Sequence, residues 1–458
     1  MKATALASLA CAALSVNALA AEGARPKGVP HLEHVFVILM ENHGYGQIVN
    51  NPDEPYLNGL ISSRQVSYAT NYFAVGHPSL TNYLEIVGGS NFGVRSDNNP
   101  SWHNGSCTPN LASGLINSDQ AVPANVPSSY KLEGGSICPV AGTGTDAPTE
   151  AVDAWNEVTP PSAAYLANLD GVKSLAAAPG TEGKTIADQL VADGKTWKSY
   201  QESLPFAGAD NIAYSNGTVT DVNAGSLPNK AQLPNVANLD NSVFLPGSPI
   251  GGYLKLYAAK HNPFVYFQSV QEGKGPMGLA NVVPFDGANG LYADLARGTV
   301  PSLSFIAPNQ CNDQHGRGNG DSFCAFDTVD NGGSVGLNPG LIAQGDATLQ
   351  HIVEAIKASP AWSDGRSAIV VVWDENDYSG VAAAPAAGTP FPAANQNLVL
   401  VTVDTNYRRS PNIASNVYYN HFSLLRTLEA AFGLPCLNHA CDGDVTVMSD
   451  LFAAPHDD

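Results

Sequence analysis

The chain is short of charged residues, which make up 14% of its 458 positions. Positive charge is the scarcer sign: 21 Lys and Arg stand against 41 Asp and Glu, for a formal net charge of −20. An acidic chain repels polyanions, so this composition argues against binding to nucleic acid or to an anionic membrane surface. An anionic ligand would need a local source of positive charge, such as a bound cation.

Long apolar runs are missing after residue 19, and none approaches the roughly 20 residues that cross a bilayer. At the start of the chain, Lys2 precedes an apolar stretch over residues 3–19, which ends in the small-residue pattern Ala18-Leu19-Ala20. This pattern is typical of a signal peptide over residues 1–20, cleaved near Ala20 or Ala21. A membrane anchor is the alternative, but the run is short and ends in small residues. We therefore expect a periplasmic or extracellular protein with no integral membrane segment after signal removal.

The sequence has no CxxC pair, which argues against a cysteine zinc site. Of the seven cysteines, Cys11 lies in the predicted signal peptide, and the remaining six are an even number, as expected for disulfides in an exported protein. The alternative is that one pair stays reduced. Proximity along the chain favours the pairs Cys107–Cys138, Cys311–Cys324 and Cys436–Cys441.

Short β-branched or aromatic runs alternate with helical patterns along the chain. The runs predict buried strands at Val35–Met40, Phe264–Val270, Ser302–Ile306, Ile369–Trp373 and Leu398–Val403. The helical patterns cover Thr185–Asp193, Leu349–Ala358 and Phe422–Phe432. Their alternation predicts an α/β fold with a mostly parallel central sheet and helices on both faces.

Two long stretches lack this periodicity. Residues 98–180 are rich in Asn, Ser, Gly and Pro, and residues 205–250 are polar with further Gly and Pro. Stretches of this length are typical of functional insertions or lids, and neither separates two complete cores. We predict one domain over residues 31–440 with these two loop-rich insertions, followed by a tail over residues 441–458.

Polar side chains directly follow two of the predicted strands. Glu41 and Asn42 come after the strand at 35–40, and Asp374 and Glu375 come after the strand at 369–373. Ligands gather at the carboxyl ends of strands in α/β sheets, and carboxylate and amide oxygens bind hard cations. Adjacent acids also repel one another unless a cation neutralises them. A polar turn is the alternative for the first motif, and a structural acidic loop is the less favoured alternative for the second.

Three further motifs are weak when taken alone. Ser79 lies where a loop enters a predicted helix, which suits a helix N-cap as well as a nucleophile. Asp313 and His315 are spaced so that an extended or turn conformation aims both at one ion, although a disulfide-pinned surface loop is equally compatible. His421 directly precedes the helix at 422–432, where a lone histidine usually caps the helix or bonds locally.

The order of these motifs resembles that of the alkaline phosphatase superfamily, in its phosphoesterase branch of bacterial acid phosphatases and phospholipases C. The residues that carry the resemblance are Met40-Glu41-Asn42-His43, His77-Pro78-Ser79-Leu80-Thr81-Asn82-Tyr83, Asn312-Asp313-Gln314-His315, Trp373-Asp374-Glu375 and His421-Phe422-Ser423-Leu424-Leu425-Arg426-Thr427. Trp197-Lys198-Ser199-Tyr200 and Lys260-His261-Asn262-Pro263-Phe264 are similar to further landmarks of the family. The resemblance runs from about Val35 to Leu434 and is weakest in the two insertions.

The resemblance implies an alkaline-phosphatase-like fold and a metal-dependent enzyme that hydrolyses phosphate monoesters through a phosphoserine intermediate. It makes Ser79 the nucleophile, and it makes His261 a group that touches phosphate or protonates the leaving group. Asn82 and His77 are the implied phosphate-binding residues. The implied ligands of one or two divalent ions are Glu41, Asn42, Asp313, His315, Asp374, Glu375 and His421. The Asp374-Glu375 pair departs from the usual Asp-His or Asp-Asp, so the number of ions stays open.

Three alternatives compete with this interpretation: a phospholipase C-type phosphodiesterase, a serine ester hydrolase and a non-catalytic exported binding protein. Gly332-Gly333-Ser334-Val335-Gly336 matches G-x-S-x-G by letter, but no apolar strand leads into it. The oxygen ligands suit Mg, Ca or Mn, and the histidines admit Zn or Fe. The expected substrate is a small phosphate ester or a phospholipid head group. We also expect Ser79 Oγ to lie within a few ångströms of the carboxylates of Glu41 and Asp374.

Overall fold

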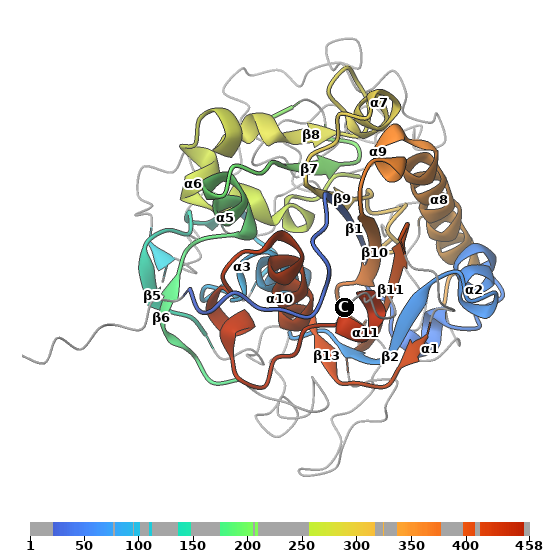
Figure 1. The fold of residues 1–458 in the computed structure, drawn as a ribbon, viewed down its shortest axis with the longest axis horizontal. Helices are drawn as coiled ribbons and strands as arrows, with labels where there is room; N and C mark the ends of the chain where they lie inside the picture. Colours follow the sequence, from blue (N-terminus) through green and yellow to red (C-terminus); the bar gives the residue numbers. More distant parts are fainter. Residues whose placement is uncertain are drawn as a thin grey trace, which may run out of the picture.

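The structure of the protein is a computed structural model, shown as a ribbon in Figure 1. It describes residues 22–76, 78–94, 96–100, 110–111, 136–147, 175–204, 207–208, 256–316, 324, 337–376, 397–407 and 413–452. The predicted signal peptide, His77, the 332–336 segment and most of both predicted insertions lie outside these residues.

A nine-stranded sheet forms the centre of the described part of the chain. Its spatial order is β12 (Ala414–Ser415), β2 (Ser67–Phe73), β11 (Leu398–Thr405), β10 (Ser367–Trp373), β1 (His34–Met40), β9 (Leu303–Ala307), β7 (Trp197–Gln201) and β8 (Val282–Pro284), and β13 (Tyr419–Asn420) also pairs with β2. Pairing is parallel throughout except that β11 runs antiparallel to both of its neighbours. The predicted mostly parallel sheet is therefore confirmed.

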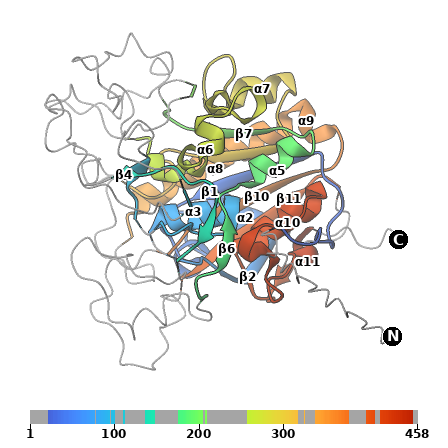
Figure 2. The ribbon, with the colours of Figure 1, turned by 90° about the vertical axis from the view of Figure 1, so that its left-hand side faces the viewer.

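Helices cover both faces of this sheet, as predicted (Figure 1). On one face lie α3 (Ser79–Gly88), α5 (Ile186–Ala192) and α10 (His421–Phe432), and on the other lie α2 (Pro55–Ser62), α8 (Pro339–Ala358) and α9 (Pro360–Ser363). Figure 2 shows α7 (Leu291–Arg297) near the β7 end of the sheet and α11 (Ser449–Phe452) near the β2 end. Two small sheets pair β3 (Asn99–Pro100) with β4 (Ser136–Ile137) and β5 (Thr143–Thr145) with β6 (Pro179–Glu182).

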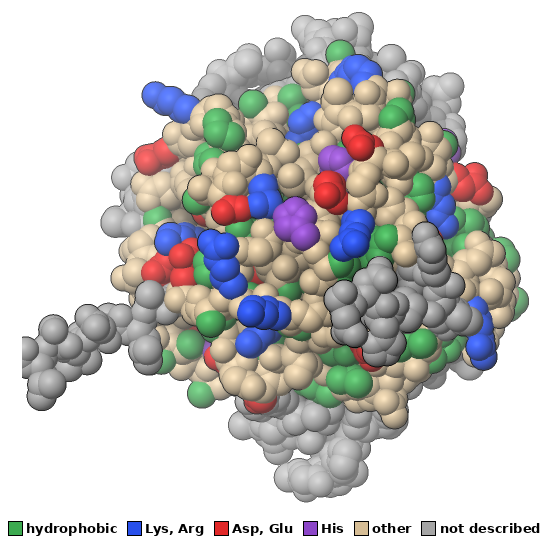
Figure 3. Space-filling model, viewed as in Figure 1, with side chains coloured by type: hydrophobic (Ala, Val, Ile, Leu, Met, Phe, Trp, Pro, Cys, Tyr) green, Lys and Arg blue, Asp and Glu red, His purple; other side chains and the backbone are tan. Residues whose placement is uncertain are grey.

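The remaining elements are short. They are α1 (Tyr45–Ile48), α6 (Gln268–Gln271), and the 3-10 turns η6 (Ala259–His261), η7 (Pro263–Tyr266), η8 (Gly275–Met277), η9 (Leu279–Asn281) and η11 (Asn438–Cys441). None of the described helices is long and apolar enough to cross a membrane. On the face drawn in Figure 3, acidic and basic side chains of the described residues are interspersed, so neither sign gathers into one patch there.

Four of the five predicted strands are found, and the fifth prediction is wrong. Residues 264–270 form η7 and α6 instead of a strand. Pro263 opens η7 with a φ angle suited to a helical turn, and the following residues from Phe264 to Phe267 are all buried. A run that is buried on every side has no period of two or 3.6, so its pattern cannot distinguish a strand from buried turns.

Two predicted helices have nearly the expected bounds, and the third is longer. Thr185 caps α5 through its side chain, and Gly433 ends α10 in the left-handed conformation. The helix predicted at Leu349–Ala358 begins ten residues earlier, at Pro339, because Asn338 accepts hydrogen bonds from the N–H groups of the first turn.

The main cluster of buried apolar residues extends from Leu32 to Phe452. It includes Met448 and Leu451, so residues 441–452 are not the tail that was predicted from residue 441 onward. The apolar residues of this short segment show no clear period, which is why the sequence contained no sign of this contact. The predicted disulfides Cys311–Cys324 and Cys436–Cys441 are confirmed, whereas Cys107, the predicted partner of Cys138, lies outside the described residues.

The topology fixes where the polar motifs meet. Because β1, β9 and β10 are mutually parallel, the residues that follow Met40, Ala307 and Trp373 emerge at one edge of the sheet. β2 and β13 run in the same direction as β10, since β11 is antiparallel to both β10 and β2. The loops that lead to Ser79 and His421 therefore reach the same edge.

Candidate active site

Ser79 is the first residue of α3, and it is buried. It does not cap this helix: the N-cap position belongs to Pro78, which makes no side-chain cap bond. The Ser79 hydroxyl instead lies 3.0 Å from Glu375 Oε1 and 3.2 Å from Glu41 Oε2, within donating distance of both carboxylates. Ser79 is therefore not the N-cap of this helix, which was the alternative to a chemical role.

Glu41 and Glu375 reach Ser79 from adjacent parallel strands. Glu41 follows β1 and Glu375 lies two residues after the end of β10, and both side chains are buried. The Ser79–Glu41 distance therefore agrees with the expectation from sequence. The second carboxylate that contacts the Ser79 hydroxyl also follows β10, but it belongs to Glu375. The sequence had led us to expect its neighbour, Asp374.

Asp374 joins the cluster through the backbone of the β1 loop. Its N–H donates to Met40 O at 3.0 Å, and its Oδ1 accepts from the N–H of Asn42 at 3.1 Å. Asn42 has a φ of 58°, a left-handed conformation that Asn tolerates better than most residues and that turns its N–H toward Asp374. Burial and the charges of Glu41 and Glu375 raise the pKa of Asp374 well above its usual range.

His261 lies between two buried carboxylates. Its Nε2 is 3.0 Å from Glu41 Oε1 and its Nδ1 is 3.1 Å from Asp313 Oδ2, and its ring stacks on Tyr83 at 5.3 Å between centroids. Burial alone would lower the pKa of His261, but the charge of Glu41 and hydrogen bonds to both acids raise it to about 9. Both ring nitrogens are directed at carboxylates, which suits an imidazolium held in place.

The same contacts act on the two acids. Burial would raise the pKa of Glu41, but His261, His315 and Lys260 together hold it well below its usual range. Burial raises the pKa of Asp313 to about 6, although its hydrogen bond to His261 and the attraction between them work in the opposite direction. Glu41 is therefore the more strongly ionised of the two.

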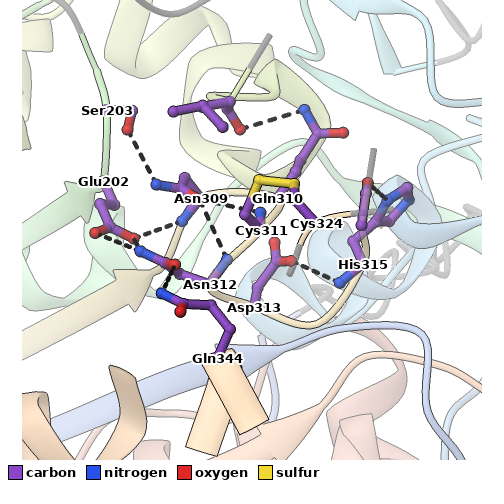
Figure 4. Close-up of a disulfide and its surroundings, with 12 residues drawn as sticks. Glu202, Ser203, Asn309, Gln310, Cys311, Asn312, Asp313, His315, Cys324 and Gln344 are labelled. Atoms are coloured by element: carbon purple, nitrogen blue, oxygen red, sulfur yellow. Dashed lines mark hydrogen bonds between the residues drawn. A yellow bond between two sulfur atoms is a disulfide. The ribbon is translucent and has the colours of Figure 1, made fainter. Parts of the chain in front are cut away.

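Asp313 and His315 lie on a loop that the Cys311–Cys324 disulfide closes (Figure 4). Glu202, just after β7, holds the other side of this loop by accepting hydrogen bonds from Asn309 N and Asn312 Nδ2. Asp313 Oδ1 accepts from the backbone N–H of His315 at 2.8 Å, so the Asp313 side chain is held against the backbone of this loop. Sequence reasoning missed Glu202, because a lone Glu after a short strand gives no signal.

Lys260 brings an ammonium group close to Ser79. Its Nζ lies 3.4 Å from Ser79 Oγ, 3.0 Å from His315 Nε2 and 2.8 Å from Asp97 Oδ2. From the sequence, Lys260 was identified only as part of a family landmark beside His261. Nothing in the sequence pointed to Asp97, which lies 18 residues after Ser79 along the chain.

His421 reaches the site from the start of α10, but it contacts the backbone and a tyrosine. Its Nε2 lies 2.6 Å from Asp374 O, which can only accept, and its Nδ1 lies 2.9 Å from the hydroxyl of Tyr72. The carbonyl requires a donor at Nε2, so a neutral ring accepts the proton of the Tyr72 hydroxyl at Nδ1. Burial accordingly lowers the pKa of His421 to about 4. In this arrangement His421 supports the peptide of Asp374, and ion binding by His421 stays a prediction.

Asn82, one turn into α3, connects the loop before Ser79 to Glu375. Its Oδ1 accepts from the N–H groups of Val75 and Gly76, and its Nδ2 donates to Glu375 Oε2 at 3.1 Å. Phosphate binding by Asn82 stays a prediction, as it does for His77, which lies outside the described residues.

The charge and free acceptor atoms of this cluster fit a divalent cation. Asp374 Oδ2 is buried and accepts no hydrogen bond from any residue that the structure describes. Within the same part of the chain, one oxygen of Glu41 and one nitrogen each of His261 and His315 lie within 4.8 Å of one another. Buried carboxylate oxygens that face one another without donors are the chemistry that Mg²⁺, Mn²⁺ or Ca²⁺ neutralises, and the imidazoles extend the fit to Zn²⁺.

A sequence model described as the Phosphoesterase family matches residues 50–325 and 338–435 of the chain. The chain is 25% identical over 426 residues to a phosphatidylinositol-3-phosphatase of Mycobacterium tuberculosis, covering 93% of this chain and 85% of that protein. It is 22% identical over 281 residues to an acid phosphatase of Aspergillus fumigatus, covering 61% of this chain and 36% of that protein. With a phosphate-repressible acid phosphatase of Penicillium chrysogenum the identity is 22% over 372 residues, covering 80% and 52%. The chain thus spans about half or less of these two fungal relatives.

Solved structures give weaker likenesses. A protein in the alkaline phosphatase superfamily from Vibrio parahaemolyticus has a TM-score of 0.39 at 14% identity, covering 90% of this chain and 69% of that one. The C-terminal periplasmic domain of EcEptC from Escherichia coli has a TM-score of 0.38 at 10% identity, covering 95% and 91%. The family assignment therefore rests on the sequence matches.

Proposed function

The chain belongs to the phosphoesterase family and is a hydrolase of phosphate esters, and from this premise we propose that it hydrolyses phosphate monoesters through Ser79 in a metal-dependent reaction. The observation that carries the proposal is the position of the Ser79 hydroxyl, 3.0 Å from Glu375 and 3.2 Å from Glu41 at the carboxyl edge of the sheet. A monoester is favoured over a diester because relatives in two kingdoms carry the names of phosphomonoesterases, including one that acts on a lipid head group.

The reaction proposed is a double displacement at phosphorus. Ser79 Oγ forms a bond to phosphorus as the bond between phosphorus and the leaving oxygen breaks, and the hydroxyl proton passes to a carboxylate beside it. The leaving oxygen then takes up that proton, so the alcohol departs neutral and the carboxylate is ionised again. Water then attacks the phosphoserine, releases phosphate and returns a proton to Ser79. Glu41, Asn42, Asp374 and Glu375 would hold the divalent cation, which lowers the pKa of the hydroxyl and offsets the charge of the substrate.

The helix terminus contributes less to anion binding than its position suggests. The N–H of Leu80 already donates to Asp97 Oδ1 at 3.0 Å, and the N–H of Thr81 donates to Pro78 O at 3.0 Å. These bonds use the second and third N–H groups of α3, which would otherwise face a phosphate. Most of the positive charge that the substrate needs would therefore come from side chains and from the proposed cation.

The test compares Ser79→Ala with Ser62→Ala, an exposed serine on α2 that donates only to the backbone. Each protein is assayed with a phosphate monoester, a bis-ester and phosphatidylcholine, and its metal content is measured. We expect Ser79→Ala to lose turnover by at least about 10⁴-fold while it keeps its metal, since removing a nucleophile leaves only binding and electrostatics. We expect Ser62→Ala to match the wild type. Turnover retained by Ser79→Ala, or activity unchanged by a chelator, would contradict the proposed mechanism.

We also propose that the protein is exported to the periplasm or the cell exterior. The support is the signal-like pattern of residues 1–20 together with two disulfides, which are typical of oxidising compartments. N-terminal sequencing of the protein secreted by its host should begin near Ala21 or Glu22, and an intact Met1 would contradict the proposal.

A further inference from the structure

Lys260 lies beside Ser79 and also contacts Asp97 and His315. It lies on η6, directly before His261, and its side chain is 11% exposed. Burying an ammonium group is costly unless it is paired, and Asp97 pairs with it at 2.8 Å. That pair alone would satisfy the charge. The ammonium nevertheless also lies 3.4 Å from Ser79 Oγ.

Asp97 fixes the direction of this ammonium relative to the nucleophile. One of its oxygens pairs with Lys260, and the other accepts the N–H of Leu80, the residue after Ser79. A single carboxylate therefore ties the lysine to the first turn of α3.

His315 completes the arrangement from the opposite side. An ammonium can only donate, so His315 Nε2, 3.0 Å away, is the acceptor, and its Nδ1 donates to Gly316 O at 3.0 Å. His315 is thus a neutral ring whose lone pair points at Lys260. Since both nitrogens of His261 face carboxylates, Lys260 is the cationic group that touches Ser79 among the residues described here.

We propose, resting on the phosphatase function above, that Lys260 is a catalytic residue that binds an oxygen of the phosphoryl group carried by Ser79, with Asp97 as its positioning residue. Phosphoryl oxygens bonded through phosphorus to Ser79 Oγ come within reach of an ammonium that already lies 3.4 Å from that atom. The charge-assisted hydrogen bond strengthens as negative charge builds on the phosphoryl group, so Lys260 stabilises the transition state more than the substrate. The lysine supplies positive charge that the N–H groups of Leu80 and Thr81, which already donate to Asp97 and Pro78, do not.

The test replaces the charge and keeps the length, with Lys260→Met. The matched control is Lys198→Met, a lysine that pairs with the buried Asp294 and lies on β7 near its amino end. Removing one transition-state donor costs about 10²–10³-fold in kcat, so Lys260→Met should lose about that much, with inhibition by inorganic phosphate weakened at least tenfold and metal content unchanged. Lys260→Arg should recover part of the loss, and Lys198→Met should keep wild-type kinetics.

Wild-type kcat/KM and unchanged phosphate inhibition in Lys260→Met would overturn the proposal. So would a second metal ion per chain that is lost on replacing His315, because an ion at His315 Nε2 would take the place of the ammonium. If Lys260→Met fails to fold, Asp97→Asn keeps the lysine but weakens the ion pair that positions it. A kcat for Asp97→Asn equal to that of the wild type would also overturn the proposal. Should the wild type hydrolyse no monoester, the proposed function fails, whereas the phosphate-binding comparison still decides the role of Lys260.

Discussion

Gly345, on α8, has no side chain, and this leaves room for the side chain of Gln314 beside it. A Cβ at Gly345 would lie 2.3 Å from Cγ of Gln314, far inside contact distance. Gln314 lies between Asp313 and His315 and has a φ of 77°. Its buried amide donates to Glu54 Oε2 at 2.7 Å and to Ile342 O at 3.2 Å. Its Oε1 accepts from the indole of Trp373 at 3.0 Å, and this bond ties the Asp313 loop to the end of β10.

The expected cost of Gly345→Ala follows from these contacts. Displacing Gln314 breaks three hydrogen bonds to buried groups, at about 1 kcal/mol each. Overpacking adds about 1–3 kcal/mol, and the higher helix propensity of Ala returns about 1 kcal/mol. The sum predicts a loss of about 3–5 kcal/mol in the free energy of unfolding. Metal affinity should fall as well, because the displaced residue connects Asp313 to Trp373.

Urea denaturation of the wild type, Gly345→Ala and Gly59→Ala provides the assay. Gly59 lies in α2, is exposed, and has nothing within 4 Å of an added Cβ. The same substitution should therefore stabilise the protein there by about 0.5–1 kcal/mol. Adding Gly345→Ala to a Gln314→Ala protein should cost little more than Gln314→Ala alone, since the clash is gone. A Gly345→Ala protein as stable as Gly59→Ala would refute the reasoning.

Two further predictions concern ionised groups. Burial alone would lower the pKa of His439, but hydrogen bonds to Asp146 and Asp442 raise it from 6.5 to about 9; its stabilisation is complete below pH 6.5 and disappears as pH rises to about 9. A shift of that size is worth about 3 kcal/mol, reduced to about 2 because Asp442 is 39% exposed. From pH 6 to 10 the free energy of unfolding should therefore fall by about 2 kcal/mol less in His439→Gln than in the wild type, and the fall that remains comes in part from His261, whose pKa is also raised to about 9. Asp374→Asn should make the metal-free protein more stable than the metal-free wild type, because burial and the charges of Glu41 and Glu375 disfavour the Asp374 carboxylate. Asp374→Asn should also gain no thermal stability from added Mg²⁺ or Mn²⁺, and a metal-induced rise in its Tm equal to that of the wild type would count against Asp374 as a ligand.

The strands that end in the site are the part of the fold that the sequence made visible. Val35–Met40 and Ile369–Trp373 are uninterrupted apolar runs that stop at carboxylates, because the strands are buried on both faces and the polar residues begin at the sheet edge. β2 was missed because Ser67–Phe73 mixes Thr, Asn and Ser into a strand near the edge of the sheet. Its direction nevertheless decides where Ser79 emerges, and only the pairing with β11 reveals it.

The contacts that surround Ser79 were harder to predict, and for a different reason. Lys260, Asp97 and Glu202 come from separate loops and carry no spacing or periodicity that connects them. His421 was expected to bind an ion because of its place in the order of motifs, whereas its hydrogen bonds to Asp374 O and Tyr72 depend on side-chain orientation. Order along the chain can indicate which residues share an edge, but it contains no information about which atoms face each other.

The Ser79 hydroxyl carries one proton, yet two carboxylates lie at hydrogen-bond distance from its oxygen. It can donate to one of them at a time, so the contact with the other needs a shared proton or a cation between the oxygens. Without an ion, the pKa of Asp374 is raised well above its usual range, which favours a proton on this carboxyl group. That proton reduces the repulsion between Asp374 and the carboxylates of Glu41 and Glu375. A divalent cation would replace this proton and leave Glu41 and Glu375 ionised, ready to accept the proton of Ser79. Together with Lys260, it would give a chain with a net charge of −20 the local positive charge that a phosphate ester requires.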